Sequence, residues 1–331
     1  MRNMFATLNS LADLDLTLLT TFKKIWLDPV NGGDQRSGKT LQEAVKTLAA
    51  AYALATTGKN DMIMLVSNGL STGTARVDEA FTWTKDATHL VGIATGNRIS
   101  PRARIAPTAA TTAFANFITV TGDGCLFRNI HINHGFTTGV AAAIAVTLNG
   151  ANYNRFENVH FGGMADNASA QSATSRAVKI YNSGENEFVG CTFGVDTIAR
   201  TVANCLVEFT SPAVGGAAYN PRNKFIDCDF VAWTTTVQTQ LDIQGTLAGC
   251  TDRWTLFDRC RFMNSLQASG YLIQTSVATV DAANKGTLIF KDCCLVGRTG
   301  FGPDGTTRAF CRIEGGATVN NTTAISLAPN A

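Results

Sequence analysis

A seven-residue segment that occurs six times constrains the fold of this chain more than any other feature. Every copy has a phenylalanine at its second position, followed by apolar residues three and five positions later. The phenylalanines are Phe127, Phe156, Phe188, Phe225, Phe257 and Phe290, at intervals of 29, 32, 37, 32 and 33 residues. A short segment that recurs about every 30 residues is typical of solenoids, in which each repeat packs on its neighbours.

The residue types within the segment predict a strand, a corner and a second strand. The phenylalanine points inward, the next two residues turn the corner, and the apolar positions after them alternate inward as in a strand. The corner holds Asn, Asp or Gly in five of the six copies, and these residues tolerate the left-handed backbone of a tight bend. Arg259 departs from this pattern.

A further strand with an apolar, polar, apolar pattern occurs in nearly every coil. These strands are Val146–Asn149, Val178–Asn182, Val207–Ser211, Leu241–Gly245 and Cys311–Gly315. Two or three short strands per coil of about 30 residues predict an all-β chain folded as a single-stranded parallel β-helix. An antiparallel sandwich or barrel would not require the same Phe and Cys positions to recur.

Four of the nine cysteines occupy one inward position of the repeat, which the first two copies fill with Ile130 and Val159. These cysteines are Cys191, Cys228, Cys260 and Cys293. We expect them to act as small hydrophobic residues of the core, because a metal site needs ligands that converge on one point. Stacked side chains also stay wider apart than the ~3.8 Å between the Cβ atoms of a disulfide. The sequence therefore predicts buried, reduced thiols.

Composition excludes several classes of partner. Only 16% of the 331 residues are charged and the net charge is +2, so the basic stripe of a nucleic-acid-binding protein is missing. No apolar run reaches the ~18 residues of a membrane span, and the N-terminal residues lack the apolar core of a signal peptide. We therefore expect no nucleic-acid or membrane partner, and a chain that folds in a cytosol.

Residues 33–40 match the phosphate-binding pattern G-x-x-x-x-G-K-[ST], with Lys39 as its lysine. A strand at 25–27 precedes the pattern. A helix that begins at a Thr40-to-Glu43 capping box is expected to follow it. The apolar residues that this helix would bury are Leu41, Val45, Leu48 and Tyr52. A nucleotide-hydrolysing enzyme also needs an acidic Mg²⁺ ligand at the end of a neighbouring strand. The strands expected at 62–66 and 89–93 lack one, so we expect no nucleotide cofactor.

The chain resembles the pectin-lyase-like β-helix superfamily, of the kind found in bacteriophage virion proteins. The motifs that carry the resemblance are Trp26-Leu27-Asp28-Pro29, Gly32-Gly33-Asp34, Gly38-Lys39-Thr40, Asp61-Met62-Ile63-Met64-Leu65 and Gly69. The resemblance covers residues 25–315 and implies a right-handed β-helix with an N-terminal capping helix. Enzymes of this superfamily cleave polysaccharides with clustered acidic Ca²⁺ ligands and an Arg or Lys base, or with stacked carboxylates and Gly-His-Gly and Arg-Ile-Lys elements. None of these signatures is complete here, and Asn133-His134-Gly135 comes nearest to the histidine element.

We assign no catalytic, cofactor-binding or metal-binding residue, but two carboxylates are the first candidates for a sugar-cleaving pair. Asp229 and Asp258 are chosen because such a pair requires carboxylates ~5–9 Å apart. The alternative for Asp229 is a surface ion pair with Arg261, one coil away. Asp227 and Asp292 share the corner position, where Asp is primarily a turn former.

Two histidines occupy equivalent outward positions of neighbouring coils. His131 and His160 are candidates for binding a transition metal. Two ligands alone make a weak site, so we expect these side chains to be solvated surface residues.

The repeat boundaries divide the chain into four segments. We expect an N-terminal arm or anchor at 1–24, a capping strand and helix at 25–60, the parallel β-helix at 61–315 and a C-terminal tail or cap at 316–331. The residues of the arm that fit one face of a short helix are Leu8, Leu11, Leu14, Leu18 and Phe22.

The low charge, the leading arm and the incomplete catalytic signatures favour a non-enzymatic structural protein of a bacteriophage virion. Such a chain would be a capsid decoration, collar or tail-associated protein that assembles in the host cytoplasm. We expect a homotrimer that contacts other virion proteins such as capsid or tail proteins, with glycans as further candidate partners. A polysaccharide-degrading tailspike, lyase or hydrolase and a bacterial surface adhesin remain as alternatives.

Overall fold

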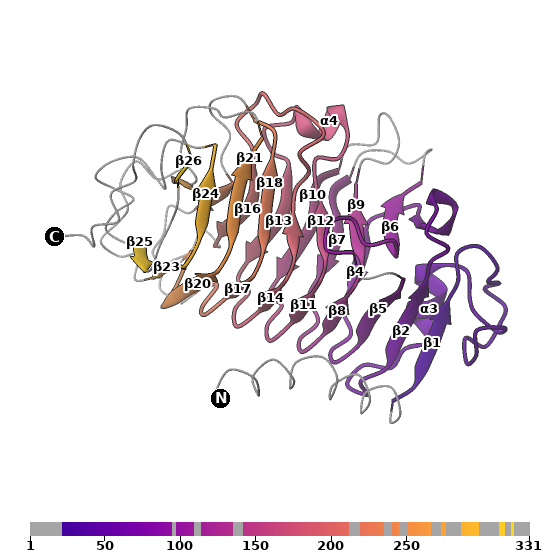
Figure 1. Ribbon diagram of the computed structural model, residues 1–331. Helices are drawn as coiled ribbons and strands as arrows, with labels where there is room; N and C mark the ends of the chain where they lie inside the picture. Colours follow the sequence, from indigo (N-terminus) through magenta and orange to yellow (C-terminus); the bar gives the residue numbers. More distant parts are fainter. Residues whose placement is uncertain are drawn as a thin grey trace, which may run out of the picture.

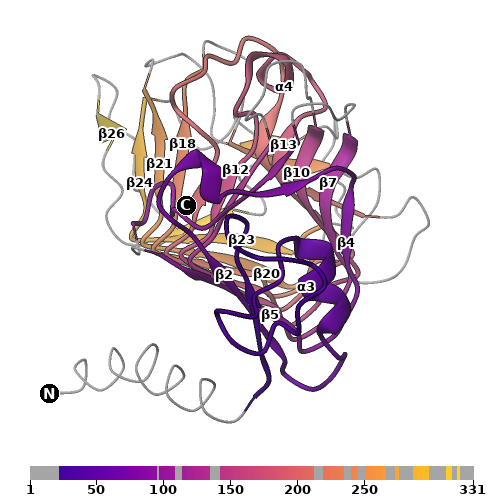
Figure 2. The same cartoon turned by 90° about the vertical axis from the view of Figure 1, so that its right-hand side faces the viewer.

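The protein winds into a coil whose walls are three parallel β-sheets, as the computed structural model shows (Figures 1 and 2). The residues described are 22–94, 97–108, 114–134, 142–211, 219–234, 240–244, 250–265, 273–275, 286–297, 311–314 and 319–320. In a typical coil the chain passes from β8 (Leu126–Arg128) to β9 (His131–Asn133) and then to β10 (Ala142–Asn149), each in a different sheet. The next coil pairs in parallel with all three strands. The predicted all-β parallel β-helix is confirmed.

Each sheet contains one strand from nearly every coil. Sheet A contains β1 (Lys24–Leu27), β2 (Met62–Val66), β5 (His89–Ile93), β8, β11 (Arg155–Glu157), β14 (Glu187–Val189), β17 (Lys224–Ile226), β20 (Trp254–Asp258), β23 (Thr287–Lys291) and β25 (Cys311–Glu314). Sheet B contains β3 (Ala75–Val77), β6 (Arg104–Pro107), β9, β12 (His160–Gly162), β15 (Thr192–Phe193), β18 (Asp229–Ala232), β21 (Arg261–Asn264), β24 (Cys294–Val296) and β26 (Val319–Asn320). Sheet C contains β4 (Phe81–Trp83), β7 (Phe114–Val120), β10, β13 (Arg176–Tyr181), β16 (Cys205–Thr210), β19 (Leu241–Gln244) and β22 (Ile273–Thr275).

Left-handed residues turn the corner between sheets A and B. The corner residues and their φ angles are Asn129 (52°), Asn158 (48°), Gly190 (60°), Asp227 (53°), Arg259 (52°) and Asp292 (51°). This confirms the corner predicted from the repeat, including its exception. Arg259 adopts the same backbone despite its Cβ atom, and its guanidinium donates to both carboxylate oxygens of Asp227 at 2.9 and 3.0 Å. Hydrogen bonding to Asp227 raises the pKa of Arg259 above its usual value.

Two columns of stacked phenylalanine rings fill the interior. In the sheet A column, Phe188, Phe225 and Phe257 have ring centroids 4.6 and 4.7 Å apart and nearly parallel planes. A second column in sheet B includes Phe193 and Phe230, with centroids 4.7 Å apart. Rings of the two columns meet edge to face. Parallel in-register pairing places identical side chains over one another at the strand spacing of ~4.8 Å, which matches these centroid distances.

The cysteine column lies at the corner between the two phenylalanine columns. Cys191, Cys228 and Cys260 are fully buried and Cys293 is 3% exposed, and all four are free thiols. Each sulfur lies 3.3 Å from a backbone carbonyl oxygen of the preceding coil, as Cys228 does from Phe188. Burial raises the pKa of the Cys191 and Cys260 thiols well above the usual range. The predicted core position is confirmed.

The strand predicted at Cys311–Gly315 lies in a different sheet from the one expected. Val146–Asn149, Val178–Asn182, Val207–Ser211 and Leu241–Gly245 overlap strands of sheet C. Strand β25 instead joins sheet A beside β23, where Ile313 is in register with Phe290. Strands of all three sheets alternate apolar and polar residues, so this alternation could not assign the strand to one sheet. The pairing of Ile313 with Phe290 shows that it belongs to sheet A.

The N-terminal helix is shorter than predicted. Helix α3 spans Leu48–Leu54, and its N-cap is Thr47, whose side chain accepts a hydrogen bond from Ala50 N. Thr40 Oγ1 does accept from Glu43 N at 3.2 Å, but only a turn forms there and Leu41 is 45% exposed. The predicted helix start is therefore wrong. The structure also has the short helices α4 (Asn167–Ala170) and η1 (Ser71–Gly73).

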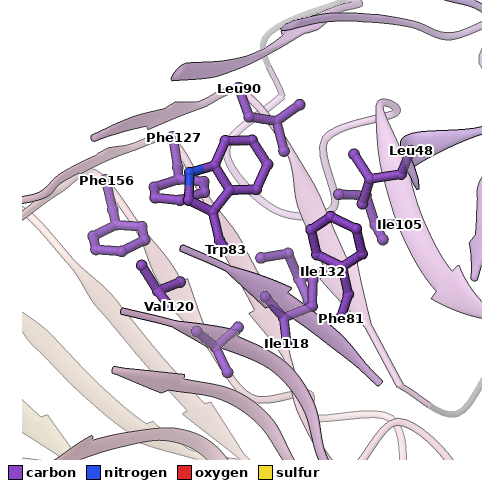
Figure 3. Close-up of a pocket in the computed structure, with 11 residues that line it drawn as sticks. Leu48, Phe81, Trp83, Leu90, Ile105, Ile118, Val120, Phe127, Ile132 and Phe156 are labelled. Carbon is purple, nitrogen blue, oxygen red and sulfur yellow. The ribbon is translucent and has the colours of Figure 1, made fainter. Parts of the chain in front are cut away.

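Helix α3 packs at the N-terminal end of the coil, beside β4 and β5 in Figure 2. Leu48 and Ala51 belong to the buried core, and the Tyr52 ring lies 4.7 Å from that of Trp83. A cavity of about 10 Å³ remains behind the helix, among apolar side chains that include Trp83, Leu90 and Phe127 (Figure 3). It has room for at most about one water molecule and offers that water no polar partner. The cavity is a packing gap.

Two predicted segments lie largely outside the described residues. The arm is described only from Phe22 onward, and the tail only at Val319–Asn320. The first stacked strand is β1, which pairs with β2 from Lys24 to Leu27.

Candidate functional site

A polar column runs along the outward side of sheet B. His131, His160, Thr192, Asp229 and Arg261 are in register on five successive strands. The first four are buried, although they point away from the coil interior. They are covered by the segment 97–103, which precedes β6 and crosses the column. We call this segment the strap.

The two histidines form a stacked pair under the strap. Their ring centroids lie 4.2 Å apart with planes inclined by 8°, and His131 and His160 are only 5% and 4% exposed. The expectation that they are solvated surface residues is wrong, because the strap covers them. The strap comes from a distant part of the sequence, so the repeat pattern did not reveal this cover. Ser100 N donates to His160 Nδ1 at 3.1 Å, and His160 Nε2 lies 2.8 Å from the Gly194 carbonyl oxygen.

These contacts leave the pair poorly suited to a metal ion. Both ring nitrogens of His160 already have partners, and His131 Nδ1 lies 3.3 Å from Ser100 Oγ. The remaining nitrogen, His131 Nε2, is 2.4 Å from where a Cβ atom on Gly162 would lie, so it faces backbone at close range. Within the described ranges, no group of three His, Cys, Asp or Glu side chains is arranged to hold a metal ion.

Asp229 is held between two arginines. Arg261 contacts both carboxylate oxygens, with Nη2 2.7 Å from Oδ2, and Arg98 of the strap places Nε 2.7 Å from Oδ2. The hydrogen bonds that Arg261 donates to Asp229 raise the pKa of Arg261. The ion pair expected with Arg261 is present, but Asp229 is 2% exposed, so this is a buried carboxylate and not a surface one.

The predicted sugar-cleaving pair is divided between two sheets. Asp229 lies on β18 of sheet B, whereas Asp258 lies on β20 of sheet A and is in register with Ile226. Asp258 accepts from Arg259 Nη1 at 2.9 Å. Both carboxylates thus have arginine partners.

Sequence reasoning missed a second pair of carboxylates, on sheet C. Glu208 and Asp242 are in register on adjacent strands and each is 5% exposed. Arg176 Nε donates to Glu208 Oε2 at 2.6 Å, Arg176 Nη2 lies 3.7 Å from Asp242 Oδ2, and Lys179 Nζ lies 3.3 Å from Glu208 Oε1. The register of the third strand in each coil was the available signal, since it places Lys179, Glu208 and Asp242 in one column.

The charges in the sheet C cluster are balanced within the cluster. Burial disfavours the charge on Arg176, but negative neighbours including Glu208 and Asp242 outweigh it and raise its pKa. A glycosidase requires one carboxyl group that carries a proton and can reach the sugar. Glu208 and Asp242 are instead buried beside the same guanidinium, an arrangement suited to stabilising the wall of the coil.

The segment that matches the phosphate-binding pattern forms a closed turn. The amides of Gly33 and Gly38 donate to the carbonyl oxygens of Ala44 and Glu43 at 3.0 and 2.7 Å. The carboxylate of Asp34 accepts from Lys46 N and Thr47 N at 2.8 Å each. A phosphate cradle needs free amides that point at the anion, and here these amides are used internally. Lys39 is exposed on the outside of the turn.

Comparison with known proteins gives a fold and no family assignment by sequence. No family model matches the chain, and no curated protein matches it.

Within the described residues, no helix has the length and apolar character needed to cross a bilayer.

Solved structures with the same architecture do match. A pectin methylesterase in complex with a hexasaccharide aligns with a TM-score of 0.54 and 14% identity, over 93% of this chain and 92% of that one. Pectate lyase Pel9A aligns with a TM-score of 0.50 and 14% identity, over 94% and 80%. The ORF18 protein of Geobacillus virus E2 aligns with a TM-score of 0.50 and 13% identity, over 93% of this chain and 58% of that protein. Identities this low show the fold alone.

Proposed function

We propose that this chain, which has the pectin-lyase-like right-handed parallel β-helix fold, is a non-enzymatic structural protein of a bacteriophage particle. The observation that carries the proposal is the charge pairing on the outer walls. The carboxylates of Glu208, Asp229 and Asp258 each lie within 3 Å of an arginine side chain. Glu208 and Asp229 pair with arginines of neighbouring coils and so stabilise the stacking, whereas Asp258 pairs with Arg259 of its own coil. Carboxylates held in this way are not available to a substrate.

The outer wall of sheet A supports the same interpretation. Arg155 contacts Glu157 on its own strand and Glu187 on the next, and Lys224 lies 2.7 Å from Glu187. Alternating charges thus bind three successive coils together. One structural neighbour, the ORF18 protein, belongs to a virus, which agrees with a role in a particle.

The quaternary arrangement is part of the proposal. We expect a homotrimer, because identical chains usually form closed symmetric assemblies and a coil with three flat walls packs well about a threefold axis. The arm at residues 1–24 would attach the trimer to capsid or tail proteins. Glycans remain candidate ligands of the exposed surface.

A polysaccharide-cleaving enzyme is the second candidate, and the sheet C cluster favours it. Glu208 and Asp242 are stacked carboxylates with Lys179 beside them, and both structural neighbours named as enzymes act on pectin or pectate. For this activity Arg176 would have to release one carboxylate when substrate binds.

An activity assay separates the two candidates. The full chain is incubated with a panel of acidic and neutral polysaccharides, and reducing ends and unsaturated products are measured. The structural proposal expects no turnover above a heat-inactivated control. Turnover by the native chain that is lost in Glu208→Gln but kept in Asp258→Asn would establish the enzyme and place its site on sheet C.

A further inference from the structure

The strap 97–103 is fastened to four successive coils by contacts that are distant in sequence. The Arg98 carbonyl oxygen accepts from Thr192 Oγ1 at 3.2 Å, and the Arg98 side chain pairs with Asp229. Ser100 contacts both histidines through its amide and its hydroxyl group. Arg104 Nη2 reaches back to Ser100 Oγ at 3.2 Å. At the other side, the Arg102 carbonyl oxygen accepts from Ser67 Oγ at 2.7 Å.

The backbone conformation of the strap at Ser100 is one that the residue would not adopt by its own conformational preference. Ser100 has a φ of 60°, a left-handed conformation that a residue with a Cβ atom adopts at a cost. The hydrogen bonds of Ser100 to the two histidines therefore keep the strap in its fastened shape. Loss of those bonds would let Ser100 relax.

The hydrogen bond from Ser100 N to His160 Nδ1 can form only when His160 is neutral. The Ser100 N–H group donates to His160 Nδ1, and His160 Nε2 faces the carbonyl oxygen of Gly194. A protonated imidazole carries hydrogen on both nitrogens, so Nδ1 would then oppose the Ser100 amide. Protonation at this site and the fastened strap are incompatible.

The charged groups around the histidine pair reinforce this conflict. Cationic groups on the strap and the adjoining β6 are Arg98, Arg102 and Arg104, and Arg261 lies on β21 of the same column. Asp229 on β18 already pairs with Arg98 and Arg261, and Asp196, in the turn after β15, is the remaining acid that acts on His160. A new positive charge in the stacked pair would therefore meet a largely cationic surrounding.

We propose that segment 97–103 is an acid-released strap, which the neutral His131–His160 pair holds on sheet B and which detaches when the pair is protonated. The proposal concerns a conformational device of this chain and does not depend on its role in a particle. Release would uncover the polar column His131, His160, Thr192 and Asp229 while the Phe-filled interior stays intact.

The direction of the pH dependence follows from the pKa values. Burial lowers the pKa of His160 from 6.5 to about 4 and lowers that of His131 well below 6.5, with the neighbouring His160 and Arg104 adding to the effect on His131. A released histidine would regain the ordinary value, so the released form binds protons more readily. The fastened form is fully favoured above pH 6.5 and loses its advantage as the pH falls toward 4. From His160 alone, the ratio of fastened to released strap should drop about 20-fold between pH 7 and pH 5.

Hydrogen exchange of the full chain, followed by mass spectrometry from pH 7.5 to 4.5 and corrected for the intrinsic exchange rate, tests the strap directly. Peptides that contain Ser100 should lose protection by about 20-fold or more between pH 7 and pH 5. Peptides from β13 and β16 should keep theirs, because they lie in the wall of sheet C. If the strap peptides stay equally protected at both pH values, or if all peptides open together, the proposal is overturned.

Matched histidine variants identify the group that responds. In His131→Asn/His160→Asn, an amide oxygen can accept from Ser100 N without titrating, so protection should become independent of pH. His134→Asn is the control. His134 is also buried with its pKa lowered to about 4, but its Nε2 accepts from Met164 N and not from the strap. A pH profile of strap protection that changes in His134→Asn and not in the double variant would contradict the proposal. If the double variant fails to fold, the exchange profile of the native chain still decides.

Discussion

At the residue scale, positions that repeat from coil to coil could be predicted from the sequence. The corner residues, the Phe columns and the cysteine column follow from a strand period of two and the need for left-handed backbone at a bend. The burial of His131 and His160 could not be predicted in this way. It depends on Ser100, which lies 31 and 60 residues away in the sequence and belongs to no repeat.

A further repeated position went unnoticed although the sequence contains it. The position two residues before a stacked phenylalanine is a buried asparagine in three coils: Asn154, Asn186 and Asn223. These residues form a ladder, in which the backbone N–H of one asparagine donates to the side-chain oxygen of the next at 3.0 and 3.1 Å. The signal was an N-x-F pattern in three consecutive coils. An unpaired buried amide is costly, so these residues satisfy the backbone where the chain enters sheet A.

The phenylalanine stack should contribute strongly to stability. Phe225→Ala would leave a gap between rings that now lie 4.6 and 4.7 Å away on either side, so we expect a loss of about 3–5 kcal/mol in the free energy of unfolding. Phe225→Leu, which keeps most of the apolar volume, should lose much less. Urea unfolding monitored by circular dichroism measures both. Equal losses for the two variants would argue against a packing origin.

The thiols of the cysteine column should react slowly with alkylating reagents in the native protein. Burial raises the pKa of Cys191 and Cys260, and the thiolate is the form that reacts. Iodoacetamide at pH 8 should therefore label the half-buried Cys294 before either of them, with full labelling only in denaturant. Mass spectrometry of tryptic peptides gives the order. Early modification of Cys191 or Cys260 would show that the column is open to solvent.

At the element scale, the strands of sheets A and B were predicted better than the helix that precedes them. Strands recur in register, so each copy supports the others, whereas α3 occurs once. The sequence analysis predicted Thr40 as the cap, whereas the observed N-cap is Thr47. Asp34 accepts from the amides of Lys46 and Thr47 and from Thr47 Oγ1 at 3.0 Å, which fixes the helix start at Leu48.

Removal of the true cap should weaken the N-terminal end of the coil. Thr47→Ala loses the hydrogen bond from Ala50 N and the one to Asp34, so we expect a destabilisation of about 1–2 kcal/mol. Thr40→Ala, at the position predicted from sequence, should change stability by less than about 0.5 kcal/mol because its turn is exposed. Thermal unfolding compares the two. A larger effect at Thr40 would contradict the observed helix boundary.

The same turn gives the molecule a pH dependence of its own. Burial alone would raise the pKa of Asp34, but hydrogen bonds from Thr47 and Lys46 lower it below the usual value. The carboxylate therefore stabilises the fold at neutral pH, and this contribution is lost as the pH falls below about 4. In Asp34→Asn the melting temperature should fall at pH 7 and approach that of the native chain at pH 3. An equal difference at both pH values would show that charge is not the cause.

At the scale of the whole molecule, the fold follows from repetition, but the function depends on surfaces that do not repeat. The register that stacks Phe over Phe also stacks Glu208 over Asp242 and Asp229 over Arg261. Whether such columns act as structural ion pairs or as a catalytic pair depends on their partners, which the structure shows to be arginines. We therefore interpret the ion pairs on the outer walls as contacts that hold neighbouring coils together.

The assembly proposal gives a prediction for the intact chain. Deletion of residues 1–21 should leave the coil folded, because the stack begins with β1 at Lys24 and supplies its own core. Sedimentation equilibrium should report a trimer for the full chain and for the shortened one, while only the full chain attaches to particles. A monomeric full chain would contradict the threefold arrangement.

The central claim is that this β-helix is a structural component of a virion, and quantitative mass spectrometry of purified phage particles tests it most directly. Peptides of the chain should be present at a fixed ratio to the major capsid protein, in a copy number per particle divisible by three. That ratio should survive a density gradient and a salt wash. Particles that lack the chain, with the protein recovered only in the soluble fraction, would contradict the account.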